Sequence, residues 1–165
     1  MNNITFLTGD ATAPEGAGQK IIAHVCNNMG AWGAGFVMAL SERWRQPQRE
    51  YQLWASKSRD RLLRLGEVQF VRVSPDITVA NIIGQHGTRP LGNLQPIRYE
   101  AMVQGLTLTA IRAIETNASV HAPRLGCGLA GGEWRVVEQL LRDAVCARGV
   151  PVFIYDLPRQ KEAAA

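Results

Sequence analysis

The residues HVCNNMGAWGAGF, at positions 24–36, decide how this sequence folds. They begin inside the apolar run 21–26, which is typical of a strand covered on both faces of a sheet. After them, the apolar run 36–40 predicts a helix that extends to about Trp44 and stops before Pro47. A glycine-rich loop therefore joins a buried strand to a helix.

The same alternation of strand and helix patterns continues along the chain. We expect further strands over 4–7, 67–73, 77–83, 120–122 and 151–155, and further helices over 48–63, 97–115 and 133–147. The strands on either side of the turn 74–76 are expected to form a hairpin. Alternating strands and helices predict an α/β fold with a mainly parallel sheet and helices on both faces. We expect one domain over 1–158 and a disordered tail over 159–165.

Length and composition exclude several classes of protein. The chain has 165 residues, of which 46% are hydrophobic and 19% charged, as in a globular domain. No apolar run approaches the ~18 residues that span a bilayer, and the N-terminus lacks the pattern of a signal peptide. The three widely spaced cysteines indicate a reducing compartment. We therefore expect a cytoplasmic protein that does not enter membranes.

The chain shows no spacing that is typical of a metal site. Its three histidines stand at positions 24, 86 and 121, and its cysteines form no Cys-x-x-Cys pair. We expect no metal and no other cofactor. The net charge of +4 is carried mostly by arginine, which suits a phosphate-bearing ligand but is also the composition that a high-GC genome favours.

Two glycine-rich loops are candidate phosphate sites. The first is the loop at 26–35, and the second is PRLGCGLAGGEW at 123–134, which also leads from a strand into a helix. Glycines allow the backbone to approach an anion closely, and a helix N-terminus attracts one. Neither loop is the usual NAD or ATP motif. Because both follow strands of a parallel sheet, they could hold a diphosphate between them, although glycines at such places can also serve only a tight turn.

Together these residues resemble a macrodomain of the Appr-1-p processing family. The resemblance is carried by GD at 9–10, by 24–36, and by 123–129 with Trp134, and it extends from about residue 4 to 157. It is strongest to the branch of terminal ADP-ribose glutamate hydrolases and yeast-type ADP-ribose-1''-phosphate phosphatases. It implies a three-layer α/β/α fold with a mixed, mostly parallel six-stranded sheet, and a monomer that binds ADP-ribose or an ADP-ribosylated substrate.

The resemblance also implies which residues touch the ligand. Asp10 and Ala11 would contact adenine, the first glycine loop would follow the distal ribose and diphosphate, and the second loop would cradle the diphosphate. The implied ADP-ribose contacts are Asp10, Ala11, Asn27, Gly30, Trp32, Gly33, Gly35, Gly126, Cys127, Gly128, Leu129, Ala130 and Gly131.

The resemblance weakens where catalysis is concerned. The glutamate hydrolases use a lysine near the end of the fourth strand and an aspartate in the second loop, but this chain has IGQHG at 83–87 and Ala130 at those places. The second loop is more similar to that of the phosphatases. Asn27 and His86 are the candidate catalytic residues, and Arg98 is a candidate phosphate contact. His24 and His121 lie in apolar strands and are expected in the core.

Three functions stay open at this point. The first is hydrolysis of an ADP-ribose derivative, with ADP-ribose-1''-phosphate as the leading substrate. The second is recognition of ADP-ribose without chemistry. The third is removal of ADP-ribose from modified nucleic acid or protein, for which the cations between Arg43 and Arg64 could contact a nucleic acid.

Overall fold

The structure, a computed structural model, describes residues 3–58 and 62–158. Six strands form one sheet in the order β1-β6-β5-β2-β4-β3. Their bounds are β1 Ile4–Thr8, β2 Gln19–Asn27, β3 Val68–Arg72, β4 Ile77–Gln85, β5 Ala118–Ala122 and β6 Val152–Asp156. Only β3 and β4 run antiparallel to each other, as the expected hairpin requires. The predicted mixed, mostly parallel sheet is confirmed.

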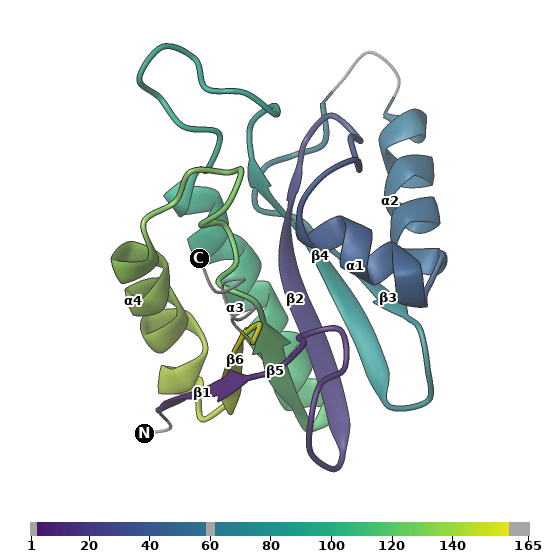
Figure 1. Cartoon of the computed structure of the whole chain (residues 1–165), viewed down its shortest axis with the longest axis vertical. Helices are drawn as coiled ribbons and strands as arrows, with labels where there is room; N and C mark the ends of the chain where they lie inside the picture. Colours follow the sequence, from purple (N-terminus) through teal and green to yellow (C-terminus); the bar gives the residue numbers. More distant parts are fainter. Residues whose placement is uncertain (1–2, 59–61, 159–165) are drawn as a thin grey trace, which may run out of the picture.

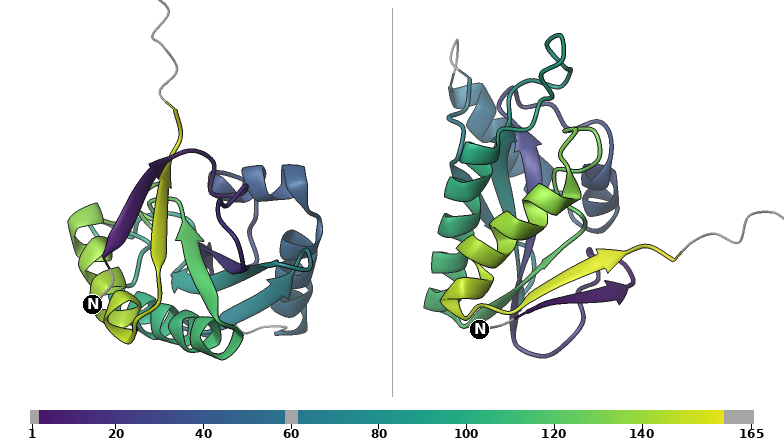
Figure 2. Two further views of the ribbon diagram at one scale, coloured as in Figure 1. Left: turned by 90° about the horizontal axis from the view of Figure 1, so that it is seen from below. Right: turned by 90° about the vertical axis from the view of Figure 1, so that its left-hand side faces the viewer.

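Helices cover both faces of this sheet (Figures 1 and 2). The helices α1 (Phe36–Arg43) and α2 (Gln46–Lys57) lie on one face, and α3 (Tyr99–Thr116) and α4 (Trp134–Ala144) lie on the other. Strand β2 alternates between the two cores, since Ile21 and Ala23 pack toward α3 whereas Ile22 and Cys26 pack toward α1 and α2. The three-layer α/β/α architecture is therefore confirmed.

Two predicted helices are shorter than expected. Helix α2 ends at Lys57 rather than at residue 63. Leu63 is buried in the core outside any helix, and its N–H donates to the carbonyl oxygen of Asn28 at 2.9 Å. Helix α4 ends at Ala144, and a single 3₁₀ turn over Cys146–Arg148 follows it. The predicted tail over 159–165 lies outside the described residues.

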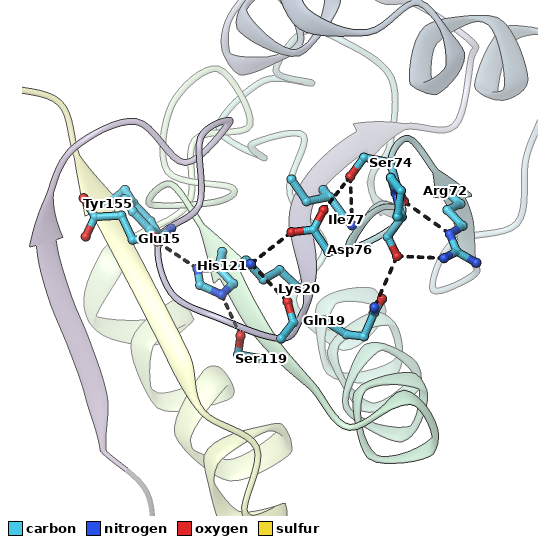
Figure 3. A network of polar contacts seen from close by, with 12 residues as sticks. Glu15, Gln19, Lys20, Arg72, Ser74, Asp76, Ile77, Ser119, His121 and Tyr155 are labelled. Carbon is cyan, nitrogen blue, oxygen red and sulfur yellow. Dashed lines mark hydrogen bonds and ion pairs between the residues drawn. The ribbon is translucent and has the colours of Figure 1, made fainter.

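At the amino ends of the central strands, polar side chains tie the long β1–β2 loop to the sheet (Figure 3). Lys20 is 5% exposed, and its ammonium group donates to the carbonyl oxygen of Gly18 at 3.0 Å and to Asp76 at 3.3 Å. The end of the loop and the β3–β4 turn are thereby joined to β2. Because Lys20 has an anionic partner, its burial leaves no unpaired charge.

A histidine anchors the same loop from the neighbouring strands (Figure 3). His121 is fully buried between the hydroxyls of Ser119, at 2.7 Å, and Tyr155, at 2.8 Å. The Tyr155 hydroxyl also accepts the N–H of Glu15 at 2.9 Å. Burial and, to a smaller extent, the positive charge of Lys20 together lower the pKa of His121 to about 4. His121 is therefore a neutral core histidine, as predicted.

Candidate functional site

A cavity of about 500 Å³ opens at the carboxyl edge of the sheet, where both glycine loops meet. It lies between the ends of β2, β4 and β5 and the start of α1. Seven of the residues expected to touch a ligand line it: Asn27, Gly33, Gly35, Gly126, Gly128, Leu129 and Ala130. The structure thus brings together two segments that are about 90 residues apart in the sequence, as the position of parallel strand ends requires.

The second glycine loop has unpaired backbone donors where it lines this cavity. Its backbone hydrogen bonds use the N–H groups of four residues: Leu125, Cys127, Gly131 and Gly132. Within residues 62–158, the backbone bonds leave the N–H groups of four cavity-lining residues without a partner: Gly126, Gly128, Leu129 and Ala130. Clustered unpaired N–H groups form a concavity with positive potential, which is suited to an anion.

The second half of the first glycine loop also has unpaired backbone N–H groups. The N–H groups of Gly33, Ala34 and Gly35 have no partner among the described residues, and all three residues line the cavity. They lead directly into α1, whose N-terminus carries the positive end of the helix dipole. The cavity is therefore bordered on two sides by backbone groups that favour negative charge.

The first half of the loop is fixed by Asn27, whose side chain is 7% exposed. Its amide oxygen accepts the N–H groups of Met29 at 2.9 Å and Ala31 at 3.1 Å, and its amide nitrogen donates to the carbonyl oxygen of Ala31 at 2.7 Å. These bonds hold the loop in one conformation. The Asn27 amide therefore shapes the cavity wall.

Tyr51 supports this loop from below, a role that the sequence did not reveal. Its fully buried hydroxyl donates to Asn27, lying 2.5 Å from the carbonyl oxygen and 2.9 Å from the amide oxygen, and it accepts the N–H of Gly30 at 3.1 Å. Burial raises the pKa of this phenol, so it stays protonated. A tyrosine in an amphipathic helix carried no signal of this contact, which depends on how α2 packs under the loop.

Trp32 also lies beneath the loop. Its side chain is 7% exposed, its indole N–H donates to the hydroxyl of Ser41 at 2.8 Å, and its ring packs against Tyr51 and His24. The predicted contact residues Gly30, Cys127 and Gly131 are likewise outside the cavity lining. These residues support the loops that form the wall.

The residues expected at the adenine end lie outside the cavity. The Asp10 carboxylate accepts the N–H of Thr12 at 2.8 Å and its hydroxyl at 2.7 Å, and it faces the guanidinium of Arg43 at 3.5 Å. Burial raises the pKa of Asp10, but the contacts with Thr12 and Arg43 lower it by a larger amount. The net pKa is below its usual value, so the carboxyl is ionised. Ala11 is buried beside it. The carboxylate is thus held between the β1–β2 loop and the end of α1.

His86 follows β4, next to the lining residue Gln85, but does not itself line the cavity. The amide oxygen of Asn28 accepts the N–H of Gly87 at 3.0 Å, so its amide nitrogen must face Nδ1 of His86, which lies 3.0 Å away. Because that amide nitrogen can only donate, the neutral ring carries its proton on Nε2.

Two titratable groups on the cavity wall are neutral. Burial lowers the pKa of His24 to about 4, although its bond to Asn81 partly offsets this, and burial raises the pKa of the Cys26 thiol. Asn81 donates to Pro47 and Gln69, so its oxygen accepts the Nε2–H of His24. His24 is the core histidine that the sequence predicted.

Arg98 does not reach the cavity. Its Nη1 donates to the carbonyl oxygens of three residues that precede α3: Gln95, Pro96 and Ile97. Arg124 instead lines the wall, together with Gln85 and Thr88. The expectation that Arg98 would be the phosphate contact therefore lacks support from the geometry.

No group of three or more His, Cys, Asp or Glu side chains in residues 3–58 and 62–158 could hold a metal ion. No helix in the same residues is long and apolar enough to cross a membrane. The chemistry of the cavity rests on backbone amides, one arginine and neutral polar side chains.

Comparisons with known proteins agree with this geometry. No protein-family model matches the chain. Its fold is similar to that of a macrodomain protein from Streptomyces coelicolor, with a TM-score of 0.83 and 50% identity over 93% of this chain and 99% of the other. It is also similar to Thermosipho africanus DarTG, solved in complex with ADP-ribose, with a TM-score of 0.74 and 19% identity over 98% of this chain and 43% of that one.

A curated relative is much longer than this chain. The chain is 33% identical over 168 aligned residues to the mouse chromodomain-helicase-DNA-binding protein 1-like. The alignment covers 96% of this chain but only 18% of the mouse protein. The chain therefore spans less than a fifth of the relative's length.

Proposed function

This chain belongs to the macrodomain family, and we propose that its cavity binds ADP-ribose, free or attached to another molecule. One observation carries the proposal: seven unpaired backbone N–H groups from the two glycine loops border one cavity at the edge of the sheet. Such groups bind a diphosphate without requiring lysines, because the fold already holds each N–H dipole in place without an internal partner. The volume of about 500 Å³ suits a small-molecule ligand.

The proposal gives each part of the ligand a place. The diphosphate lies between Gly33–Gly35 and 126–130, and the distal ribose faces the end of β2 and Gln85. Adenine lies toward Asp10, whose ionised carboxylate can accept the exocyclic amino group. DarTG, which shares the fold, was solved with ADP-ribose, and that agrees with this choice of ligand.

The binding proposal can be tested by placing a negative charge in the cavity. Gly128 lines it, and a Cβ on Gly128 would meet no atom within 4 Å, so Gly128→Glu leaves the fold intact. We expect isothermal calorimetry to show ADP-ribose binding by the wild type and none by Gly128→Glu. Thr107→Glu, at a half-buried position of α3 outside the cavity lining, is the matched control and should bind like the wild type. If calorimetry detected no binding of millimolar ADP-ribose by the wild type, the proposal would be refuted.

A second candidate function is hydrolysis of ADP-ribose-1''-phosphate. It is favoured by the tautomer of His86, whose Nε2–H can donate a hydrogen bond to a terminal phosphate beside the lining residues Gln85 and Thr88. Against it, the cavity-lining residues of the described chain include no carboxylate or ionised nucleophile. Binding is therefore the function that the geometry supports best.

Phosphate release distinguishes the two candidates. If the protein hydrolyses ADP-ribose-1''-phosphate with the help of the His86 hydrogen bond, His86→Ala should lower kcat by about 10²-fold or more while changing KM little. A wild-type protein that binds this ligand but releases no phosphate would establish recognition without hydrolysis. Equal rates for wild type and variant would exclude a catalytic role of His86.

A further inference from the structure

Arg124 is the only charged side chain that lines the cavity among the described residues. It stands directly after β5, at the start of the second glycine loop. Its side chain is 39% exposed, so it is neither buried in the core nor extended into solvent. A ligand in the cavity therefore meets one fixed cation in addition to the backbone dipoles.

The position of this guanidinium is set by an acidic partner on the adjacent strand. Nε lies 2.8 Å from Oδ1 of Asp156, and Nη2 lies 2.9 Å from Oδ2, which is the two-pronged geometry that suits a carboxylate. The pairing raises the pKa of Arg124 and, chiefly through the same hydrogen bond, lowers that of Asp156. Both groups are therefore ionised at neutral pH.

Two aromatic rings fix the plane of the same group. The guanidinium carbon lies 4.8 Å from the ring centre of Trp134 and 5.5 Å from that of Phe6, and these two rings pack edge to face. Cation–π contact with both rings restricts rotation of the side chain. Arg124 is thus held by three elements, β6, β1 and α4, before any ligand arrives.

The arrangement leaves part of the guanidinium available. Asp156 occupies one N–H on Nε and one on Nη2, so both N–H groups of Nη1 and one of Nη2 have no partner among the described residues. The Nη1 group of Arg98, by contrast, donates its hydrogen bonds to backbone carbonyl oxygens. Of the two arginines beside the glycine loops, only Arg124 presents free donors at the cavity wall.

We propose that Arg124 binds the diphosphate of ADP-ribose through Nη1 and that Asp156 is the positioning residue that orients it. The proposal rests on the proposed function. Backbone amides supply partial charges to the diphosphate, whereas Arg124 supplies the one full charge and sets how strongly binding depends on salt. Because the side chain is already ordered, little conformational entropy is lost when the ligand binds.

The test compares four proteins by calorimetry at low and high salt, with ADP-ribose and with inorganic pyrophosphate. Arg124→Gln should weaken ADP-ribose binding about tenfold at low salt and remove most of the salt dependence. Asp156→Asn should weaken it less, by about threefold, because the cation remains but is no longer oriented. Arg135→Gln is the matched control: it removes the same charge from an 89% exposed side chain on α4 and should match the wild type.

Each result decides between explanations. Arg124→Gln with wild-type affinity would overturn the proposal, and tighter binding by Asp156→Asn would show that Asp156 competes with the ligand instead of positioning Arg124. A weaker Arg124→Gln with unchanged salt dependence and unchanged pyrophosphate binding would indicate stacking on adenine, which also overturns it. If the wild type binds no ADP-ribose, the proposed function fails, and the pyrophosphate measurements then decide whether Arg124 binds a diphosphate at all.

Discussion

At the scale of single residues, the cavity depends on side chains that hold the backbone. Asn27 was expected to act on the ligand, yet its amide is bonded to Met29 and Ala31 within its own loop. Tyr51 reaches the same loop from α2 and bonds both the Asn27 and the Gly30 backbone. Where backbone amides bind the ligand, residues that fix the backbone control affinity without touching it.

The Tyr51 hydroxyl gives a test of this view. Tyr51→Phe removes the partner of the Gly30 N–H and of Asn27 while keeping the ring in the core. We expect the free energy of unfolding to fall by about 1–3 kcal/mol, since buried polar groups lose their partners. Urea unfolding measures this loss, and calorimetry should show a several-fold weaker affinity for ADP-ribose. Unchanged affinity in a destabilised variant would show that the loop holds its shape without Tyr51.

At the scale of elements, the first glycine loop and α2 are packed closely enough to constrain each other. Gly30 has φ +82°, and a Cβ placed on it would lie 2.8 Å from Cβ of Ala55. Glycine is therefore required at position 30 for two reasons, the backbone conformation and the approach of the helix. The sequence predicted both the loop and a helix that contains Ala55, but local patterns gave no indication that the two pack against each other.

This contact predicts a partial rescue by a second substitution. Gly30→Ala should destabilise the fold by about 2 kcal/mol through backbone strain and the clash with Ala55. Ala55→Gly alone should cost about 1 kcal/mol, because glycine disfavours a helix interior. In the double variant the clash is absent, so the combined loss should be smaller than the sum by about 1 kcal/mol, as a double-mutant cycle by urea unfolding would measure. Strictly additive losses would contradict the contact.

At the scale of the whole molecule, two buried histidines on different parts of the sheet share one property. His24 lies in β2 at the cavity wall and His121 lies near the end of β5, and the pKa of each is lowered to about 4, chiefly by burial. Both are hydrogen-bonded in neutral form. Their protonation in the unfolded chain near pH 6.5 therefore couples global stability to pH.

The sign of this dependence follows from the lowered pKa values. Above pH 6.5 both histidines are neutral in the folded and in the unfolded protein, so the free energy of unfolding has its full value. As pH falls from 6.5 to 4, each histidine becomes protonated in the unfolded chain but stays neutral in the folded protein. Each histidine should therefore lower the free energy of unfolding by up to about 3 kcal/mol. Urea unfolding at several pH values should show this decline, and His121→Asn should have a shallower slope. A free energy of unfolding that is constant between pH 7 and pH 5 would contradict the prediction.

The sequence by itself determined the α/β class, the order of the six strands and four helices, and the presence of two glycine loops at strand ends. These follow from local periodicity and from the backbone freedom of glycine, which neighbours in sequence specify. The core histidines at positions 24 and 121 were also predicted correctly from their apolar surroundings.

Only the tertiary structure decided which side chains meet at the cavity. It placed Tyr51 under the first loop, tied Arg98 to nearby carbonyls, and held Arg124 at the wall through Asp156 and two aromatic rings. These contacts join residues up to 128 positions apart in the chain, as Phe6 and Trp134 are. Sequence periodicity reports which face of an element is apolar, whereas the direction and partner of a polar side chain depend on how distant elements pack together.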